Sequence, residues 1–137
     1  MSLRTRVEGG RTFVLDPVRR KWVALTPEEG VRQRLLAELL ALGYPTGLVA
    51  VERAVLYAGK TWRADVVAYG RDQRPLLLAE CKAPGVTIGQ ATFDQLARYN
   101  AVLEAETLVV DNGTVRYCCV LEGGAWQFVD AIPPFPG

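Results

Sequence analysis

Apolar residues recur at helical spacing in two parts of the chain and predict one helix in each. The first helix is expected between Thr26 and Gly43, with Thr26 suited to the N-cap, Pro27 to the first helical position and Gly43 to the stop. Glu29 follows the cap by three residues, as in a capping box. The second helix is expected within residues 89–106. The apolar positions of the first helix are Val31, Leu35, Leu39 and Leu42.

Runs of apolar and β-branched residues predict the strands, and turn residues separate them. Asp16-Pro17 indicates a turn near the N-terminus, and Asn112-Gly113 is the strongest hairpin signal in the chain. The strands are expected as two short ones within residues 11–25, then at 47–59, 61–70 and 74–82, two within 107–120, and a last one at 125–129.

The order of these elements indicates an α/β protein with a central sheet flanked by helices. A chain of 137 residues with short predicted loops is expected to form one domain, residues 1–137. Within it we distinguish an N-terminal β extension (1–25), a core (26–121) and a C-terminal strand and tail (122–137).

Composition and charge exclude several kinds of chemistry. The chain has no histidine, which removes the commonest general base and every Ser-His or Cys-His nucleophile pair. Its three cysteines lack metal-site or disulfide-framework spacing, which favours a reducing, cytoplasmic location. No apolar run approaches membrane-spanning length, so no membrane partner is expected. The net charge of +1 means that nucleic-acid binding would need a local basic patch.

The most hydrophobic predicted strand ends in two opposite charges, in the stretch LLLAECKAPG. Because side chains alternate along a strand, Glu80 and Lys82 share one face, while Cys81 points the other way and is expected to be a core residue. A solvated surface ion pair is the simplest alternative for the two charges.

The preceding strand carries one acid, Asp65, among apolar residues. Alternation predicts that it shares a face with Arg63, Val67 and Tyr69, and an ion pair between Asp65 and Arg63 would explain it without any site. If the two strands pair, Asp65 and Glu80 come close together.

Two neighbouring carboxylates repel, so one of them tends to hold a proton unless a cation lies between them. Mg²⁺ or Mn²⁺ suits such a pair, because Mg²⁺ uses few protein carboxylates and leaves room for phosphate oxygens. A nearby lysine would orient or deprotonate the attacking water, or neutralise charge on a phosphate. This combination predicts phosphodiester hydrolysis without histidine.

These residues resemble a known family. WRADVV followed by LLLAECKAP is similar to the PD-(D/E)xK nuclease core, with alanine in place of the motif's proline. TPEEGVRQRLLAELLALGYP and TFDQLARYNAVLEAETLVVDNG resemble the N-terminal nuclease domain of type I restriction enzyme motor (R) subunits. The chain has no GxxxxGK[ST] phosphate loop, so it resembles that domain as a stand-alone unit.

The resemblance implies a restriction-endonuclease-like α-β-β-β-α-β core with a mixed sheet, and it implies roles for particular residues. Asp65, Glu80 and Lys82 would be catalytic, with Asp65 and Glu80 as metal ligands and the backbone carbonyl of Cys81 as a third ligand. An acid on the first helix often completes such sites. The closest match is Glu29, with Glu28 and Glu38 as alternatives, although capping explains Glu29 equally well.

Gln95 and Tyr99 resemble the QxxxY element of RecB-type nucleases and lie one turn apart on the second predicted helix. They would face the site and DNA, or be ordinary helix surface. Arg32 and Arg34 would line a phosphate path or belong to a solvated helix face.

The expected function is therefore that of a Mg²⁺- or Mn²⁺-dependent deoxyribonuclease, an endonuclease or exonuclease. The expected partners are DNA and a restriction-modification complex or motor subunit, and the resemblance allows a homodimer. The main alternative is a catalytically silent module that binds nucleic acid or a protein partner with the same fold. A nucleotide hydrolase is a weaker alternative, because the chain lacks a glycine-rich phosphate loop.

Overall fold

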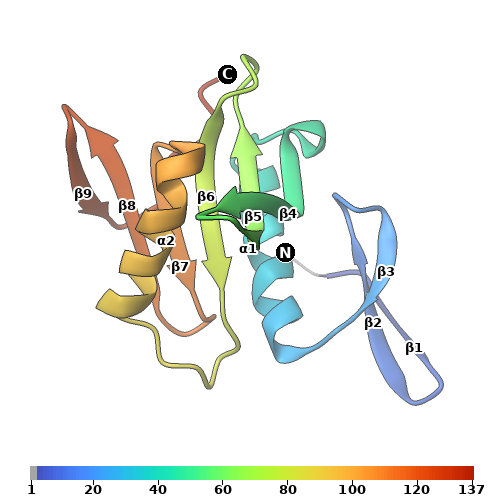
Figure 1. Cartoon of the computed structure of the whole chain (residues 1–137). Helices are drawn as coiled ribbons and strands as arrows, with labels where there is room; N and C mark the ends of the chain where they lie inside the picture. Colours follow the sequence, from blue (N-terminus) through green and yellow to red (C-terminus); the bar gives the residue numbers. More distant parts are fainter. Residues whose placement is uncertain (1–2) are drawn as a thin grey trace.

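The structure, a computed structural model, describes residues 3–137 and contains two separate sheets (Figure 1). A three-stranded antiparallel sheet lies at the N-terminus, and a six-stranded mixed sheet forms the body of the molecule. The elements are β1 (Thr5–Glu8), β2 (Arg11–Asp16), β3 (Lys21–Ala24), α1 (Pro27–Ala41), a 3₁₀ turn (Thr46–Leu48), β4 (Val49–Tyr57), β5 (Lys60–Tyr69), β6 (Pro75–Cys81), α2 (Gln90–Leu103), β7 (Thr107–Asp111), β8 (Arg116–Glu122) and β9 (Ala125–Val129).

The large sheet has the strand order β4-β5-β6-β7-β8-β9. Its strands are antiparallel except for β6 and β7, which are parallel and are connected through α2. A parallel pair needs such a crossover, because a tight turn can join only antiparallel neighbours. The mixed α/β architecture and the order of helix, three strands, helix and strand agree with the prediction.

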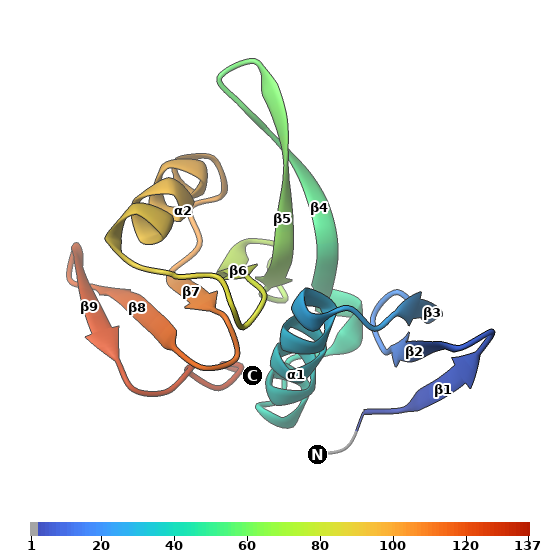
Figure 2. The same cartoon turned by 90° about the horizontal axis from the view of Figure 1, so that it is seen from below.

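The two helices cover opposite faces of the large sheet. Leu35 and Leu39 of α1 pack against one buried cluster, which includes Leu77 and Cys81 of β6. Leu96 of α2 packs against the second cluster, which takes the alternate residues of the same strands. Figure 2 shows α2 and the long β4–β5 hairpin on one side of the sheet and α1 on the other.

The predicted ends of the first helix agree with the structure. Thr26 is the N-cap, and its hydroxyl oxygen accepts a hydrogen bond from the backbone N–H of Glu29 at 3.1 Å. The chain leaves the helix at Gly43, whose φ of +94° favours glycine. The Asn112-Gly113 hairpin and the strand at 125–129 are also confirmed. β1 was not predicted, because its sequence TRVE is short and exposed at every position.

The predicted face of Asp65 is wrong in part. Trp62 and Ala64 pack on the α2 side of the sheet, whereas Val66 packs on the α1 side and Val67 again on the α2 side. Strict alternation is therefore interrupted around Asp65, opposite a residue of β4, Glu52, that has a positive φ of 54°. The irregularity separates Asp65 from Val67 and turns Asp65 toward α1.

None of the helices in the described residues is long and apolar enough to cross a membrane. The three cysteines are buried and free, and the side chain of Cys81 lies in the core, as expected.

Candidate functional site

The candidate site lies where β5 and β6 separate. The last paired residues of the two strands are Val66 and Ala79, and beyond them β6 continues beside β7 only. Cys81 is still paired with β7, but it has no paired residue on β5. Its backbone N–H donates a hydrogen bond of 2.7 Å to the Asp65 carboxylate. The Asp65 side chain thus bridges β5 and β6 at the gap where their backbone pairing ends. If the register of Val66 and Ala79 is extended by one residue, Asp65 lies opposite Glu80.

Glu80 lies at this gap with its side chain 18% exposed, and the Lys82 ammonium approaches its carboxylate at 3.4 Å. Burial and then the neighbouring charge of Asp65 raise the pKa of Glu80 to about 7, although Lys82 opposes this shift. Burial also raises the pKa of Asp65, against the hydrogen bond from Cys81. The two carboxylates therefore form an electrostatically coupled pair, and the nearby positive charge is not enough to offset the effect of burial on their pKa values.

Arg32 of α1 supplies the positive charge nearest to Asp65. Its Nη1 lies 3.5 Å from Asp65 Oδ1, a long contact compared with its two bonds to Glu29. The ion pair between Asp65 and Arg63, considered from the sequence, does not form in the described residues, where Arg63 instead approaches Glu52 at 3.9 Å. The sequence is compatible with Arg32 on a phosphate path or on a solvated face, but in the structure Arg32 is buried in a network of ion pairs with Glu29, Glu52 and Asp65.

Glu29 belongs to this network. Its carboxylate accepts bonds of 2.9 and 2.7 Å from Arg32, 3.1 Å from Gln33 and 3.0 Å from Arg19. Burial alone would raise the pKa of Glu29, but these hydrogen bonds outweigh it and lower the pKa to about 2. A carboxylate held by two arginines has little capacity left for a metal ion.

The two alternative acids on α1 differ from each other. Glu38 accepts two hydrogen bonds from Arg116, at 2.7 and 2.8 Å, and Arg116 also donates to Asp111 of β7 at 2.9 Å. Glu28 is exposed, and its charge raises the pKa of both Asp65 and Glu80. Of the three acids named from the sequence, Glu28 is the one whose charge affects the pKa values of Asp65 and Glu80.

The donor atoms of the strand gap suit a hard cation. Within residues 3–137, no cluster of three or more His, Cys, Asp or Glu side chains is arranged to hold a metal ion. Mg²⁺ requires less, because one or two carboxylates are sufficient when waters and substrate phosphates complete its shell. Asp65 and Glu80 offer oxygen ligands whose raised pKa values a divalent cation would lower again.

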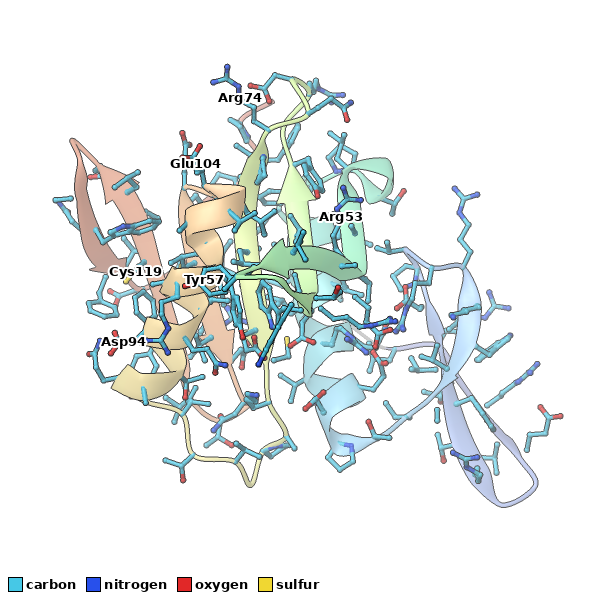
Figure 3. The ribbon with its side chains drawn as sticks, viewed as in Figure 1. Arg53, Tyr57, Arg74, Asp94, Glu104 and Cys119 are labelled. Carbon is cyan, nitrogen blue, oxygen red and sulfur yellow. The ribbon has the colours of Figure 1, made fainter. Side chains whose placement is uncertain are left out.

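Gln95 and Tyr99 of α2 contact each other, with 3.3 Å between Gln95 Nε2 and the Tyr99 hydroxyl. The ring of Tyr99 stacks on Trp62 of β5, with centroids 3.8 Å apart, and meets Tyr57 of β4 edge to face at 5.3 Å. Figure 3 shows Tyr57 beside α2. These aromatic residues attach the β4–β5 hairpin to α2. Trp62 and Tyr57 were not among the predicted site residues, although both lie beside the break between the strands expected at 47–59 and 61–70.

Fold and site together define a mixed α/β protein with a carboxylate pair and a lysine at the end of a central strand. The family described as "Type I restriction enzyme R protein N terminus (HSDR_N)" matches residues 27–133, and the chain belongs to this family. The predicted resemblance to the N-terminal domain of R subunits is thereby confirmed.

A solved fragment described as an HsdR subunit of a type I restriction enzyme from Vibrio vulnificus YJ016 has a similar fold. The TM-score is 0.55 and the identity 19%, and the match covers 73% of this chain but 22% of that one. At this identity the likeness concerns the fold alone. A search of curated proteins finds no match to the chain.

Proposed function

We propose that the chain is a metal-dependent deoxyribonuclease of the PD-(D/E)xK type, acting within a restriction-modification system. The observation that supports this proposal best is the coupled pair Asp65 and Glu80, next to Lys82, at the gap between β5 and β6. The family to which the chain belongs carries the name of a restriction enzyme subunit, which supports the biological setting.

In this proposal Asp65 and Glu80 hold Mg²⁺ or Mn²⁺, the backbone carbonyl of Cys81 is a further ligand, and Glu28 replaces Glu29 as the acid of the first helix. The cation, when bound, neutralises negative charge on the phosphate under attack. The hydrogen bond from Cys81 N–H keeps the Asp65 carboxylate oriented toward the gap. Lys82 is close enough to Glu80 to place its ammonium group beside the same phosphate.

Gln95 and Tyr99 have a supporting role in this proposal. Their contact and the stack of Tyr99 on Trp62 keep the β4–β5 hairpin against α2. Asp65 lies on the same strand as Trp62, so the stack also restrains the strand that carries the proposed metal ligand.

The second candidate function is a catalytically silent module that binds nucleic acid or a protein partner. Arg32 favours it, because an arginine within 3.5 Å of Asp65 supplies part of the positive charge that a metal ion would provide. The limited coverage of the solved fragment, 22% of its length, is compatible with docking to further domains.

Cleavage of supercoiled, linear and single-stranded DNA in the presence of Mg²⁺ or Mn²⁺ tests the proposal. The wild-type chain should cut at least one of these substrates, and Lys82→Ala should abolish cutting. Lys60→Ala is the matched control, since Lys60 is an exposed lysine at the hairpin turn and should be dispensable for cleavage. Equal inertness of the wild type and Lys82→Ala on all substrates would favour the silent module instead.

A further inference from the structure

The three-stranded sheet β1–β3 lies outside the residues matched by the family, 27–133, and its outward face carries Arg6 and Arg11 together with Glu8. Cross-strand pairing places Arg6 beside Phe13, Leu15 beside Trp22, and Glu8 beside Arg11 on the same face. The opposite face carries Val14 and Asp16, which are fully buried. The arginine-bearing face is therefore the one that faces away from the body of the protein.

Charge is distributed unevenly along the chain. Residues 1–25 contain six basic and two acidic side chains, a net charge of +4, whereas the whole chain has a net charge of +1. The remainder is therefore net negative. Arg19 is engaged with Asp16 and Glu29, and Lys21 pairs with Asp16 on the inward face, whereas Arg6 and Arg11 lie with Glu8 on the outward face. These two arginines are the local basic groups that nucleic-acid binding would require in a chain of low net charge.

Two arginines of this face are already ordered. The guanidinium of Arg6 lies 4.5 Å from the ring centre of Trp22, and that of Arg11 lies 5.6 Å from the ring centre of Phe13. A guanidinium stacked on an aromatic ring keeps its N–H donors at the rim, and less side-chain entropy is lost when they bind a phosphate. Arg6 also approaches Glu8 at 3.2 Å, an exposed pair that a phosphate can displace.

The sheet is held in a defined position relative to the candidate site. The buried carboxylate of Asp16 accepts bonds from Arg19 at 2.7 Å and from Gln33 of α1 at 2.9 Å. Arg19 in turn donates to Glu29 at 3.0 Å, and Glu29 binds Arg32, which reaches Asp65. Figures 1 and 2 show the small sheet next to α1. A ligand on the sheet would thus lie at a constrained distance from the strand gap.

We propose that the outward face of β1–β3 binds the phosphate backbone of DNA and extends the DNA footprint of the candidate site. The contacts are phosphate contacts, because the rings of Trp22 and Phe13 are already stacked by arginines and arginine is the residue best suited to bidentate phosphate binding. The inference shares DNA as the ligand with the proposed function, but it requires binding and not cleavage.

The test is the salt dependence of binding to a labelled 20-base-pair duplex, measured by fluorescence anisotropy in EDTA so that cleavage does not interfere. The double variant Arg6→Gln/Arg11→Gln should bind less tightly at low salt. The slope of log K against log salt concentration should become shallower by about 2, since each phosphate contact contributes about 0.9.

The matched control is Arg71→Gln/Arg74→Gln. It removes the same charge from the turn between β5 and β6, where Arg71 lies over Phe135 at 5.3 Å and Arg74 approaches Asp72 at 4.0 Å. Arg74 lies at the top of Figure 3, far from the small sheet. This variant should keep the wild-type slope.

A competition assay distinguishes DNA from an acidic protein as the ligand. Poly-glutamate of equal charge should displace the labelled duplex from the wild-type protein less well than unlabelled DNA does.

Equal slopes for the two double variants, no DNA binding by the wild type, or better competition by poly-glutamate than by unlabelled DNA would each overturn the inference. The last result would assign the surface to an acidic protein. A protein that shows the expected slopes but never cleaves would contradict the proposed function alone. One that cleaves with unchanged slopes would contradict this inference alone.

Discussion

The two groups of carboxylates beside α1 contrast sharply, although Arg32 touches both. Asp16 and Glu29 are buried among Arg19, Arg32 and Gln33, and hydrogen bonds lower the pKa values of both acids against the effect of burial. Asp65 and Glu80 are also largely buried, yet their pKa values are raised. We refer to the first group as the closed network and to the second as the open pair.

The difference lies in how closely the cations approach each acid, and in the sharing of Arg32 between the two groups. The closed network matches two acids with two arginines at distances of 3.0 Å or less, so its charges are compensated. The open pair has one lysine at 3.4 Å and one shared arginine at 3.5 Å. Removing one partner of a compensated buried ion pair destabilises a fold, whereas buried carboxylates with raised pKa values mark candidate functional sites.

The largest expected effect concerns catalysis by the open pair. Glu80→Gln should lower the rate of Mg²⁺-dependent DNA cleavage by about 10³-fold, a loss comparable to that of other charged groups that act on the transition state. The same variant should be at least as stable as the wild type at pH 8 without metal, since it removes an uncompensated charge. Cleavage assays and urea unfolding measure the two effects. If Glu80→Gln loses both activity and stability, Glu80 has a structural role and the predicted catalytic role is contradicted.

Glu29→Gln should have the converse result. It leaves Arg19 and Arg32 without their shared counter-charge and should lower the free energy of unfolding by about 3–5 kcal/mol, as is usual when one partner of a buried ion pair is removed. Urea unfolding at pH 7 measures this loss. Glu38→Gln is the control, because the pair of Glu38 with Arg116 is partly exposed and should contribute less than about 1 kcal/mol. If Glu29→Gln and Glu38→Gln lower the free energy of unfolding equally, the closed network is no more important for stability than a partly exposed ion pair.

The two groups should also titrate in opposite directions. Because the folded-state pKa of Glu80 is about 7, above its ordinary value, the free energy of unfolding should fall by about 3 kcal/mol as the pH rises from about 4.5 to 7. Glu29, with a pKa of about 2, contributes stability above its ordinary pKa and loses it as the pH falls from about 4.5 to 2.

Unfolding followed from pH 2 to 8 without divalent ions measures both limbs. Glu80→Gln should flatten the upper limb and leave the acid limb intact, and Mg²⁺ should restore stability at pH 8 in the wild type only. An upper limb that Glu80→Gln leaves unchanged would mean that another group titrates there.

The smallest expected effect concerns the residue shared by the two groups. Arg32→Lys keeps the charge but cannot bind Glu29 with two parallel bonds, so we expect a loss of about 1–2 kcal/mol in the free energy of unfolding. Arg32→Gln, which also removes the charge, should cost more. If both variants cost the same, the geometry of the guanidinium and not its charge would hold the network together.

Much of the fold could be predicted because local signals agreed with it. The Thr26 cap, the Asn112-Gly113 turn and the uncharged run at 125–129 each specify a local conformation, and the structure has all three. β1 was missed because its four exposed residues have no burial pattern for a prediction to use. The face of Asp65 was mispredicted because alternation assumes a regular ladder, and the strand is irregular opposite Glu52.

The amino-acid sequence already shows which chemistry is available: carboxylates and lysine without histidine, Glu80 and Lys82 at the end of a buried strand, and Asp65 on the strand before it. How each acid is compensated depends on contacts between segments that are distant in the chain. Asp65 and Glu80 become neighbours through strand pairing, and Glu29 is paired with an arginine from the β2–β3 turn ten residues away. Pairing and burial set the electrostatic state of each acid, and neither can be read from the spacing of residues along the chain.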